Sequence, residues 1–315
     1  LQVQELTRFY YDLINNAIVV RIRIDTARDA YILFETTNNR GKPLSHTDLI
    51  KNFLLGKIAE IAELQNDEQI LNDAITTWTQ IIRNIENLPS EDEFLRHFLI
   101  SKRKTVISKS KISDDFKSYF ENENIHHVVG QFQFAHQQVL QNLNRFSKIY
   151  KQIHESTFTG NRGFLNPICD NLKAIKSTPS YSFMMNLFDA EYNLDNQTII
   201  SVSKIIETFM LRLHICSVQT GGTDAIFADL INCFEHANNT QIFINDIKTK
   251  LNRHTPTDAR FLDSLKNYDF SASLIGRARY ILINLFNHGQ GNFQALQILG
   301  PNAVHVEHIL PLRPD

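Results

Sequence analysis

The chain of 315 residues is 43% hydrophobic and 21% charged, and its formal net charge at pH 7 is −2. This composition is that of an ordinary globular protein and excludes a disordered or collagen-like chain. The slight negative charge also excludes a bulk attraction to nucleic acid, so any contact with DNA has to come from local groups of basic side chains.

Cysteine use and hydropathy indicate a cytoplasmic protein. Cys169, Cys216 and Cys233 are odd in number, widely spaced and without a CxxC pair, which argues against a disulfide framework or a cysteine zinc site. The longest apolar run, 198–218, is interrupted by charged side chains, so it predicts a buried helix and not a membrane span. Residues 1–16 predict a helix rather than a signal peptide.

The first elements expected along the chain are a strand and two helices. Alternating residues at 17–25 (AIVVRIRID) predict the clearest strand. A short helix over 27–38 and a turn at 38–43 should follow. Ser45, with Asp48 three residues later, resembles a capping box and predicts a helix over 45–64.

The rest of the chain predicts helices. They are expected over 67–87, 90–101, 113–121, 129–155, 198–218 and 277–289. Apolar residues in 129–155 recur at three and four positions, which indicates a helix packed in a core or, alternatively, a coiled-coil surface for a partner. The expected fold is mainly α: a multi-helix body with short β elements near both ends of the chain.

The turn at 38–43 carries the first candidate binding residues. Asn38 and Gly41 suit turn conformations, and Arg40 and Lys42 stand just before a helix N-terminus, where backbone N–H groups and the helix dipole favour anions. One interpretation is a contact with phosphate or nucleotide. The other is a corner between elements with solvated basic side chains.

Residues 34–52 resemble a family motif. The pattern is Phe34-xxx-Asn38-xx-Gly41-xx-Leu44-xxx-Asp48-Leu49-Ile50-Lys51-Asn52. It looks like the signature near the end of the N-terminal domain of GmrSD-like proteins, the modification-dependent (type IV) restriction endonucleases of bacterial antiphage defence. The resemblance implies a ParB/sulfiredoxin-like domain that uses nucleoside triphosphate, with Asn38, Gly41 and Asp48 as motif residues.

The sequence lacks the main nucleotide-processing motif of this family, Asp-Gly-Gln-Gln-Arg. That motif lies upstream of the signature, so the chain is expected to begin inside the domain. We therefore expect no nucleotide hydrolysis by these 315 residues alone.

The histidines near residue 305 are the second candidate site. The stretch NAVHVEHILP (302–311) predicts a short strand, and it resembles the first strand of a His-Asn-His (ββα-metal) nuclease, in which an acid precedes His-Ile-x-Pro. By this resemblance, His308 is the general base, Glu307 is a metal ligand and His305 is a weaker candidate ligand. Mg²⁺ is the expected ion, since it prefers carboxylate oxygen. The alternative interpretation is that both histidines are structural or solvated.

The two resemblances support each other, because GmrSD-like proteins carry such a nuclease after a helical middle region. They imply three parts: 1–58 as the end of the nucleotide domain, 59–299 as the helical middle and 300–315 as the start of the nuclease. The whole protein is then expected to cleave modified phage DNA. A homo-oligomer is one alternative for its assembly, and the sequence leaves the oligomeric state open. The second strand and the Asn-bearing helix of the nuclease are missing here, so the 315-residue chain should not cleave DNA alone.

A basic stretch in the middle region is a candidate DNA contact. SKRKTVISKSK (101–111) contains Lys102, Arg103, Lys104, Lys109 and Lys111, which could neutralise phosphates. A solvated loop would explain the same residues. If the terminal histidines are structural as well, the chain is a helical scaffold that binds DNA or protein and catalyses nothing.

Overall fold

The computed structural model describes residues 2–18, 44–125, 132–271 and 274–289, with isolated positions at 21, 23, 24, 29 and 33. The fold is mainly α, as predicted. Its α-helices are α1 (Gln2–Asn16), α3 (His46–Gln65), α4 (Glu68–Ile85), α5 (Glu91–Arg103), α6 (Ile112–Ile125), α7 (Phe132–Glu155), α8 (Leu165–Ala174), α9 (Tyr181–Leu187), α10 (Asn196–Ile215), α11 (Thr223–Leu230), α12 (Thr240–Asn252), α13 (Asp258–Lys266) and α14 (Ile275–Gly289). Short 3₁₀ turns lie between them at η1 (Lys109–Lys111), η2 (Gly160–Arg162), η3 (Thr178–Ser180), η4 (Ala190–Tyr192), η5 (Thr220–Gly222) and η6 (Ile231–His236).

The predicted β elements receive no support. No strand occurs in the part of the chain that the structure describes, and Ala17, Arg21 and Ile24 lie outside any helix or strand. A strand forms its hydrogen bonds with a neighbouring strand, and the helices of the body offer none. The predicted strand at 302–311 and most of the predicted helix at 27–38 lie outside the described residues.

The helices begin where the sequence predicts, because side-chain caps fix their first turns. The Ser45 hydroxyl accepts a hydrogen bond from the Asp48 backbone N–H (3.1 Å) and donates one to its carboxylate (2.7 Å). Ser90 caps α5 by accepting from the Glu93 N–H (3.2 Å), and Asp195 caps α10 through the Thr198 N–H (2.9 Å). Such caps satisfy backbone donors that the helix itself leaves free.

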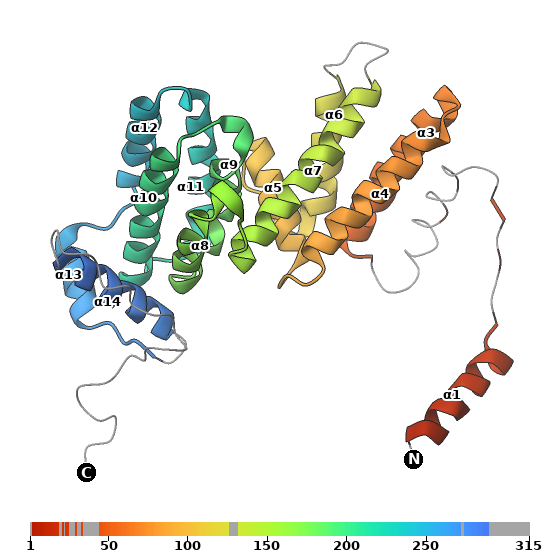
Figure 1. Cartoon of the computed structure of the whole chain (residues 1–315), viewed down its shortest axis with the longest axis horizontal. Coiled ribbons are helices and arrows are strands. Elements are labelled where there is room, and N and C mark those ends of the chain that lie inside the picture. Colours follow the sequence, from red (N-terminus) through yellow and green to blue (C-terminus); the bar gives the residue numbers. More distant parts are fainter. Residues whose placement is uncertain are drawn as a thin grey trace.

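The helical body has two groups of helices that share one core (Figure 1). Helices α3, α4, α6 and α7 pack together in the first group, and α10, α11 and α12 in the second. Helix α5 contacts both α7 and α9, which joins the groups. The boundary predicted after residue 58 falls inside α3, and residues on both sides of it belong to the same core.

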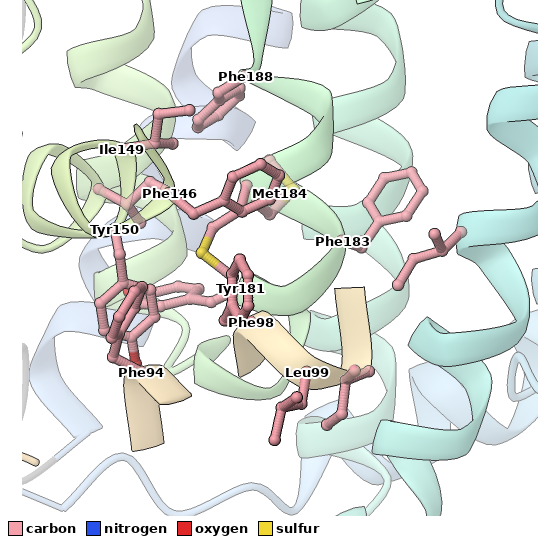
Figure 2. Packing of buried hydrophobic residues seen from close by; sticks show 14 of the residues in the cluster. Phe94, Phe98, Leu99, Phe146, Ile149, Tyr150, Tyr181, Phe183, Met184 and Phe188 are labelled. Atoms are coloured by element: carbon pink, nitrogen blue, oxygen red, sulfur yellow. The ribbon is translucent and has the colours of Figure 1, made fainter. Parts of the chain in front are cut away.

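Aromatic side chains from α5, α7 and α9 form the centre of the core (Figure 2). Phe94, Phe98 and Phe146 are completely buried, and the Phe98 and Phe146 rings meet edge to face, with centroids 5.7 Å apart. Trp78, predicted to lie in the core, is 3% exposed. Large rings bury more apolar area than any other side chains, so this centre contributes strongly to the stability of the fold.

Two neutral histidines lie within this aromatic centre. His97 is 0% exposed, and its Nδ1 lies 3.2 Å from the Tyr150 hydroxyl. Burial, helped by the charge of Arg96, lowers the pKa of His97 to about 3. Burial also lowers the pKa of His154 to about 4. Both imidazoles are therefore uncharged in the folded protein at neutral pH.

The first helix lies apart from the helical body (Figure 1). Its apolar side chains are exposed, with Leu6 at 72%, Phe9 at 65% and Leu13 at 53%. No described helix is both long enough and apolar enough to cross a membrane. The predicted buried helix at 198–218 corresponds to α10, in which Val202, Ile206 and Met210 are completely buried.

Candidate functional site

Most of the predicted catalytic and nucleotide-binding residues lie outside the described residues. These are Asn38, Arg40, Gly41 and Lys42 of the turn, and His305, Glu307 and His308 of the terminal motif. Their roles stay predictions. Asp48, which is described, lies in the first turn of α3, where its carboxylate accepts the Ser45 hydroxyl. Capping alone accounts for this geometry.

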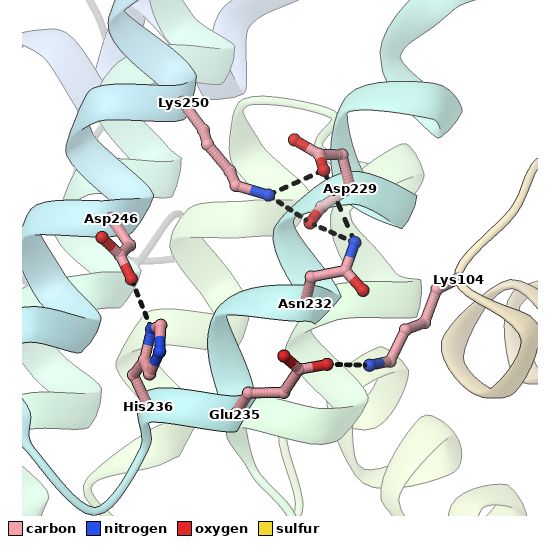
Figure 3. A network of polar contacts seen from close by, with 7 residues as sticks. All are labelled: Lys104, Asp229, Asn232, Glu235, His236, Asp246 and Lys250. Carbon is pink, nitrogen blue, oxygen red and sulfur yellow. Dashed lines mark hydrogen bonds and ion pairs between the residues drawn. The ribbon is translucent and has the colours of Figure 1, made fainter.

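The predicted basic stretch is largely engaged in contacts within the protein. Lys102 places its ammonium 3.8 Å from the centre of the Phe146 ring, and Arg103 forms an ion pair with Asp115. Lys104 reaches Glu235 at 2.8 Å, a contact that joins α5 to η6 (Figure 3). Lys109 and Lys111, on η1, are exposed.

Three of the five cations therefore contact other parts of the chain, although Glu235, the partner of Lys104, is 67% exposed and a phosphate could replace it. Lys109 and Lys111 are the two exposed candidates for a phosphate contact from this stretch. Two exposed lysines on a short turn make a weak electrostatic site, since each neutralised phosphate contributes separately to binding.

A buried carboxylate joins α14 to the body, and sequence reasoning missed it. Glu207 of α10 is 2% exposed and accepts a hydrogen bond of 2.8 Å from the Tyr280 hydroxyl of α14. The Asn171 amide lies 3.3 Å from both carboxylate oxygens, and the Lys204 ammonium lies 3.5 Å away. Burial raises the pKa of Glu207 above its usual value, although these partners oppose the shift.

Lys204 also binds α14 directly. Its ammonium donates to the Asn284 side-chain oxygen at 2.6 Å and to the Tyr280 hydroxyl at 3.2 Å. Arg277 adds a second attachment: it is 4% exposed, donates to the Ile175 carbonyl at the end of α8 (3.2 Å) and binds the Tyr268 hydroxyl. A cation is favourable there because the carbonyls at a helix C-terminus carry partial negative charge.

An open groove of about 840 Å³ runs between α10 and α12, which lie side by side in Figure 1. Its lining residues on α10 recur every three or four positions, so they form one face of that helix. This face consists of Gln197, Ile200, Ser201, Lys204, Ile205, Thr208, Phe209 and Arg212. The opposite wall is Gln241, Ile244, Lys248, Leu251, Asn252, Thr255 and Asp258.

The groove is electropositive relative to the chain as a whole. Three cations, Lys204, Arg212 and Lys248, line it together with a single carboxylate, Asp258, whereas the chain has a net charge of −2. Asp258 is 82% exposed and pairs with Arg212 at 2.5 Å. Lys248 is exposed and forms no ion pair among the described residues. These groups suit the binding of an anionic ligand.

Sequence reasoning noted the charged side chains that interrupt the apolar run 198–218; one of them, Arg212, pairs with Asp258. It missed the groove, because polar residues on one face of a helix usually indicate a solvated surface. The signal that could have found it is the polar side chains that recur on one face of each of two helices, 196–215 and 240–252.

A metal site is not formed by the described residues, where no three His, Cys, Asp or Glu side chains gather closely enough to bind an ion. The described residues thus form a helical body with an open polar groove and a polar junction that holds α14. The chain matches no family model, no curated protein and no solved structure.

Proposed function

We propose that this chain is the helical middle part of a bacterial antiphage DNA endonuclease, a nucleotide-dependent enzyme that senses modified DNA. The stretch His305-Val306-Glu307-His308-Ile309-Leu310-Pro311 carries the proposal, because it combines an acid with the His-Ile-x-Pro of a His-Asn-His nuclease strand. The GmrSD-like signature at 34–52 supports it from the other end of the chain.

The proposed chemistry is hydrolysis of a phosphodiester bond. His308 as a neutral imidazole takes a proton from the attacking water, a contribution of about 10²- to 10⁴-fold to the rate. Glu307, with His305 beside it, holds a divalent ion, with Mg²⁺ expected, and this ion would stabilise negative charge on the scissile phosphate and the leaving oxygen. Nucleoside triphosphate would be used by the domain to which Asn38, Gly41, Arg40 and Lys42 belong.

Helix α14 supports this proposal in one respect. It ends at Gly289, 16 residues before His305, and Glu207, Lys204 and Arg277 attach it to the body. A helix attached in this way would give a nuclease segment a fixed origin on the scaffold, and positioning of this kind is a large part of catalysis.

The test measures DNA cleavage by the protein that the whole reading frame encodes. Nicking of modified and unmodified DNA is followed with Mg²⁺ and nucleoside triphosphate, comparing the wild type with His308→Ala. His288→Ala is the matched control, since His288 is an exposed histidine of α14. Loss of nicking in His308→Ala alone, with unchanged circular dichroism, supports the nuclease; equal nicking by all three proteins removes His308 from the chemistry.

A non-catalytic scaffold that binds DNA or protein is the second candidate. The open α10/α12 groove is the observation that favours it, because its lysine, arginine and uncharged polar side chains suit the binding of an anion. No nicking by the wild type on any of several modified DNAs, combined with retained DNA binding, would select this function.

A further inference from the structure

We propose that the α10/α12 groove binds the sugar-phosphate backbone of DNA. The proposed function enters only in the choice of DNA as the polyanion; the location comes from the groove itself. The basic stretch at 101–111, where the sequence predicted the DNA contact, is then a minor surface.

The residue types of the groove are those that contact a DNA backbone. Phosphate and sugar oxygens receive most of their hydrogen bonds from Arg, Lys, Ser, Thr, Asn and Gln side chains. Nine of the 15 lining residues are of these types; they are Gln197, Ser201, Lys204, Thr208, Arg212, Gln241, Lys248, Asn252 and Thr255. The remaining lining residues are apolar, apart from Asp258, and can pack against sugars.

The charges are arranged along the groove and not at one point. Lys204 and Arg212 lie eight residues apart on α10, which corresponds to about 12 Å along the helix axis. Lys248 stands on the opposite wall. A polyanion with regularly spaced charges can meet both Lys204 and Arg212, which lie too far apart along α10 for one small anion to reach both.

The length of the groove suits a short stretch of one strand. From Gln197 to Arg212 the α10 wall extends about 22 Å at 1.5 Å per residue. At about 3.4 Å per base pair, this wall is as long as about six base pairs of B-DNA measured along the duplex axis.

Existing ion pairs in the groove do not prevent binding. Asp258 is 82% exposed, and a pair with such an exposed carboxylate contributes little to stability, so a phosphate can replace it at Arg212. Lys204 is 52% exposed and adds positive potential to the groove while its ammonium stays with Asn284, Tyr280 and Glu207. Lys248 needs no rearrangement, which makes it the best residue for a test.

The experiment measures binding of the 315-residue chain to a short fluorescein-labelled DNA duplex, and to the single strand of the same sequence, by fluorescence anisotropy at about 50 and 200 mM salt. Lys248→Glu should weaken binding to the duplex about tenfold at the lower salt and reduce the salt dependence by at least one phosphate contact. Gln197→Glu should weaken it as well, by a smaller factor. This change places an acid in the first turn of α10, where it is compatible with the helix dipole.

Two controls separate the groove from other basic surfaces. Lys148→Glu makes the same charge change at an exposed lysine of α7, and Lys109→Glu/Lys111→Glu changes the predicted basic stretch. Both should keep the affinity within about twofold of the wild type. Circular dichroism checks that each variant is folded.

Three results would overturn the proposal. They are the absence of binding at the lower salt, equal weakening by Lys248→Glu and Lys148→Glu, and a loss confined to Lys109→Glu/Lys111→Glu. Because cleavage is not measured here, a groove that binds DNA and a nuclease that fails are separate outcomes.

Discussion

The central junction of the body and the junction that holds α14 use opposite chemistry. At the centre, α5, α7 and α9 meet through buried rings such as Phe98 and Phe146, both 0% exposed. At the second junction, α14 meets α10 through the hydrogen bonds of Glu207, Lys204 and Tyr280. The central junction depends on the apolar area removed from water, and the α14 junction depends on hydrogen bonds and charge.

This difference predicts different responses to solution conditions. Apolar burial is insensitive to salt and to the ionisation of carboxylates, and it is lost only when the helices separate. A charged, hydrogen-bonded junction responds to pH through the buried Glu207 and to salt through the half-exposed Lys204. The central junction should therefore decide whether the protein is folded, whereas the second should decide how firmly α14 is attached.

The outer surface of α14 supports the same distinction. Leu282 is 51% exposed and Leu285 is 63% exposed, so the outer face of the helix buries little apolar area, whereas Ala278 and Tyr280 on its inner face are 8% and 5% exposed. The polar contacts consequently carry a larger share of its attachment than such contacts do in the core. Local opening of α14, without global unfolding, is the expected behaviour of an element held in this way.

The largest effect is expected from a cavity at the centre. Phe98→Ala should reduce the free energy of unfolding by about 3–5 kcal/mol, because the lost ring leaves a space that the neighbouring rings cannot fill. Urea denaturation followed by circular dichroism measures it. Phe286→Ala is the comparison, since Phe286 on α14 is 36% exposed; a loss there as large as in Phe98→Ala would contradict the assignment of the core.

Acid should destabilise the central junction through His97. The pKa of His97 is about 3 in the folded protein, below the value of 6.5 in the unfolded chain, so protons bind the unfolded state more readily. This contribution is fully present above pH 6.5 and should fall by about 2–3 kcal/mol between pH 6.5 and pH 4.5.

The variant His97→Gln tests this origin of the acid sensitivity. Glutamine cannot titrate, although it can still bond to the Tyr150 hydroxyl, so the variant should lose less stability than the wild type over the same pH interval. Urea denaturation at several pH values gives the two slopes. Parallel slopes would show that His97 does not contribute to the acid effect, which would then come from other groups such as His154.

A smaller effect is expected at the Glu207 junction. Glu207→Ala should cost about 2 kcal/mol, because the Tyr280 hydroxyl and the Asn171 amide lose a buried acceptor. Glu207→Gln should cost less than Glu207→Ala, since it keeps an acceptor and removes a charge that is unfavourable to bury.

The raised pKa of Glu207 gives this pair of variants a pH dependence. A carboxyl group whose pKa is higher in the folded state stabilises the fold more as the pH falls through that pKa. The free energy of unfolding of the wild type should therefore rise relative to that of Glu207→Gln between pH 7 and pH 5. Urea denaturation at the two pH values measures this difference. A loss of wild-type stability relative to Glu207→Gln between pH 7 and pH 5 would reverse the sign assigned to this group.

The sequence predicted the helices well because their signals are local. The predicted ranges 67–87, 90–101 and 129–155 match α4, α5 and α7 to within three residues at each end. Apolar periodicity and the Ser45 and Ser90 caps are sufficient for this. The strand at 17–25 has no comparable local signal, since alternation becomes a strand only when a neighbour pairs with it.

The candidate sites were less predictable because they depend on distant residues. Lys104 was expected to meet DNA, but it pairs with Glu235, 131 residues away, and no spacing in the sequence indicates that contact. Glu207 looked like one of several charges interrupting an apolar run, and only the packing of α14 makes it a buried acceptor. The α10/α12 groove likewise exists only once two helices lie together.

The smallest effect should be confined to α14. Asn284→Ala removes the oxygen that receives the Lys204 ammonium at 2.6 Å, so hydrogen exchange in α14 should become faster by an amount equivalent to about 0.5–1 kcal/mol. Alanine also raises helix propensity, which opposes the effect. Asn287→Ala makes the same change on an exposed position one turn further along α14 and measures that gain alone. The difference between the two variants isolates the contact with Lys204.

Two results would contradict this prediction. Slower exchange by the same amount in both variants would mean that Lys204 does not hold α14. Faster exchange throughout α5 and α7 would mean that the two junctions do not open separately.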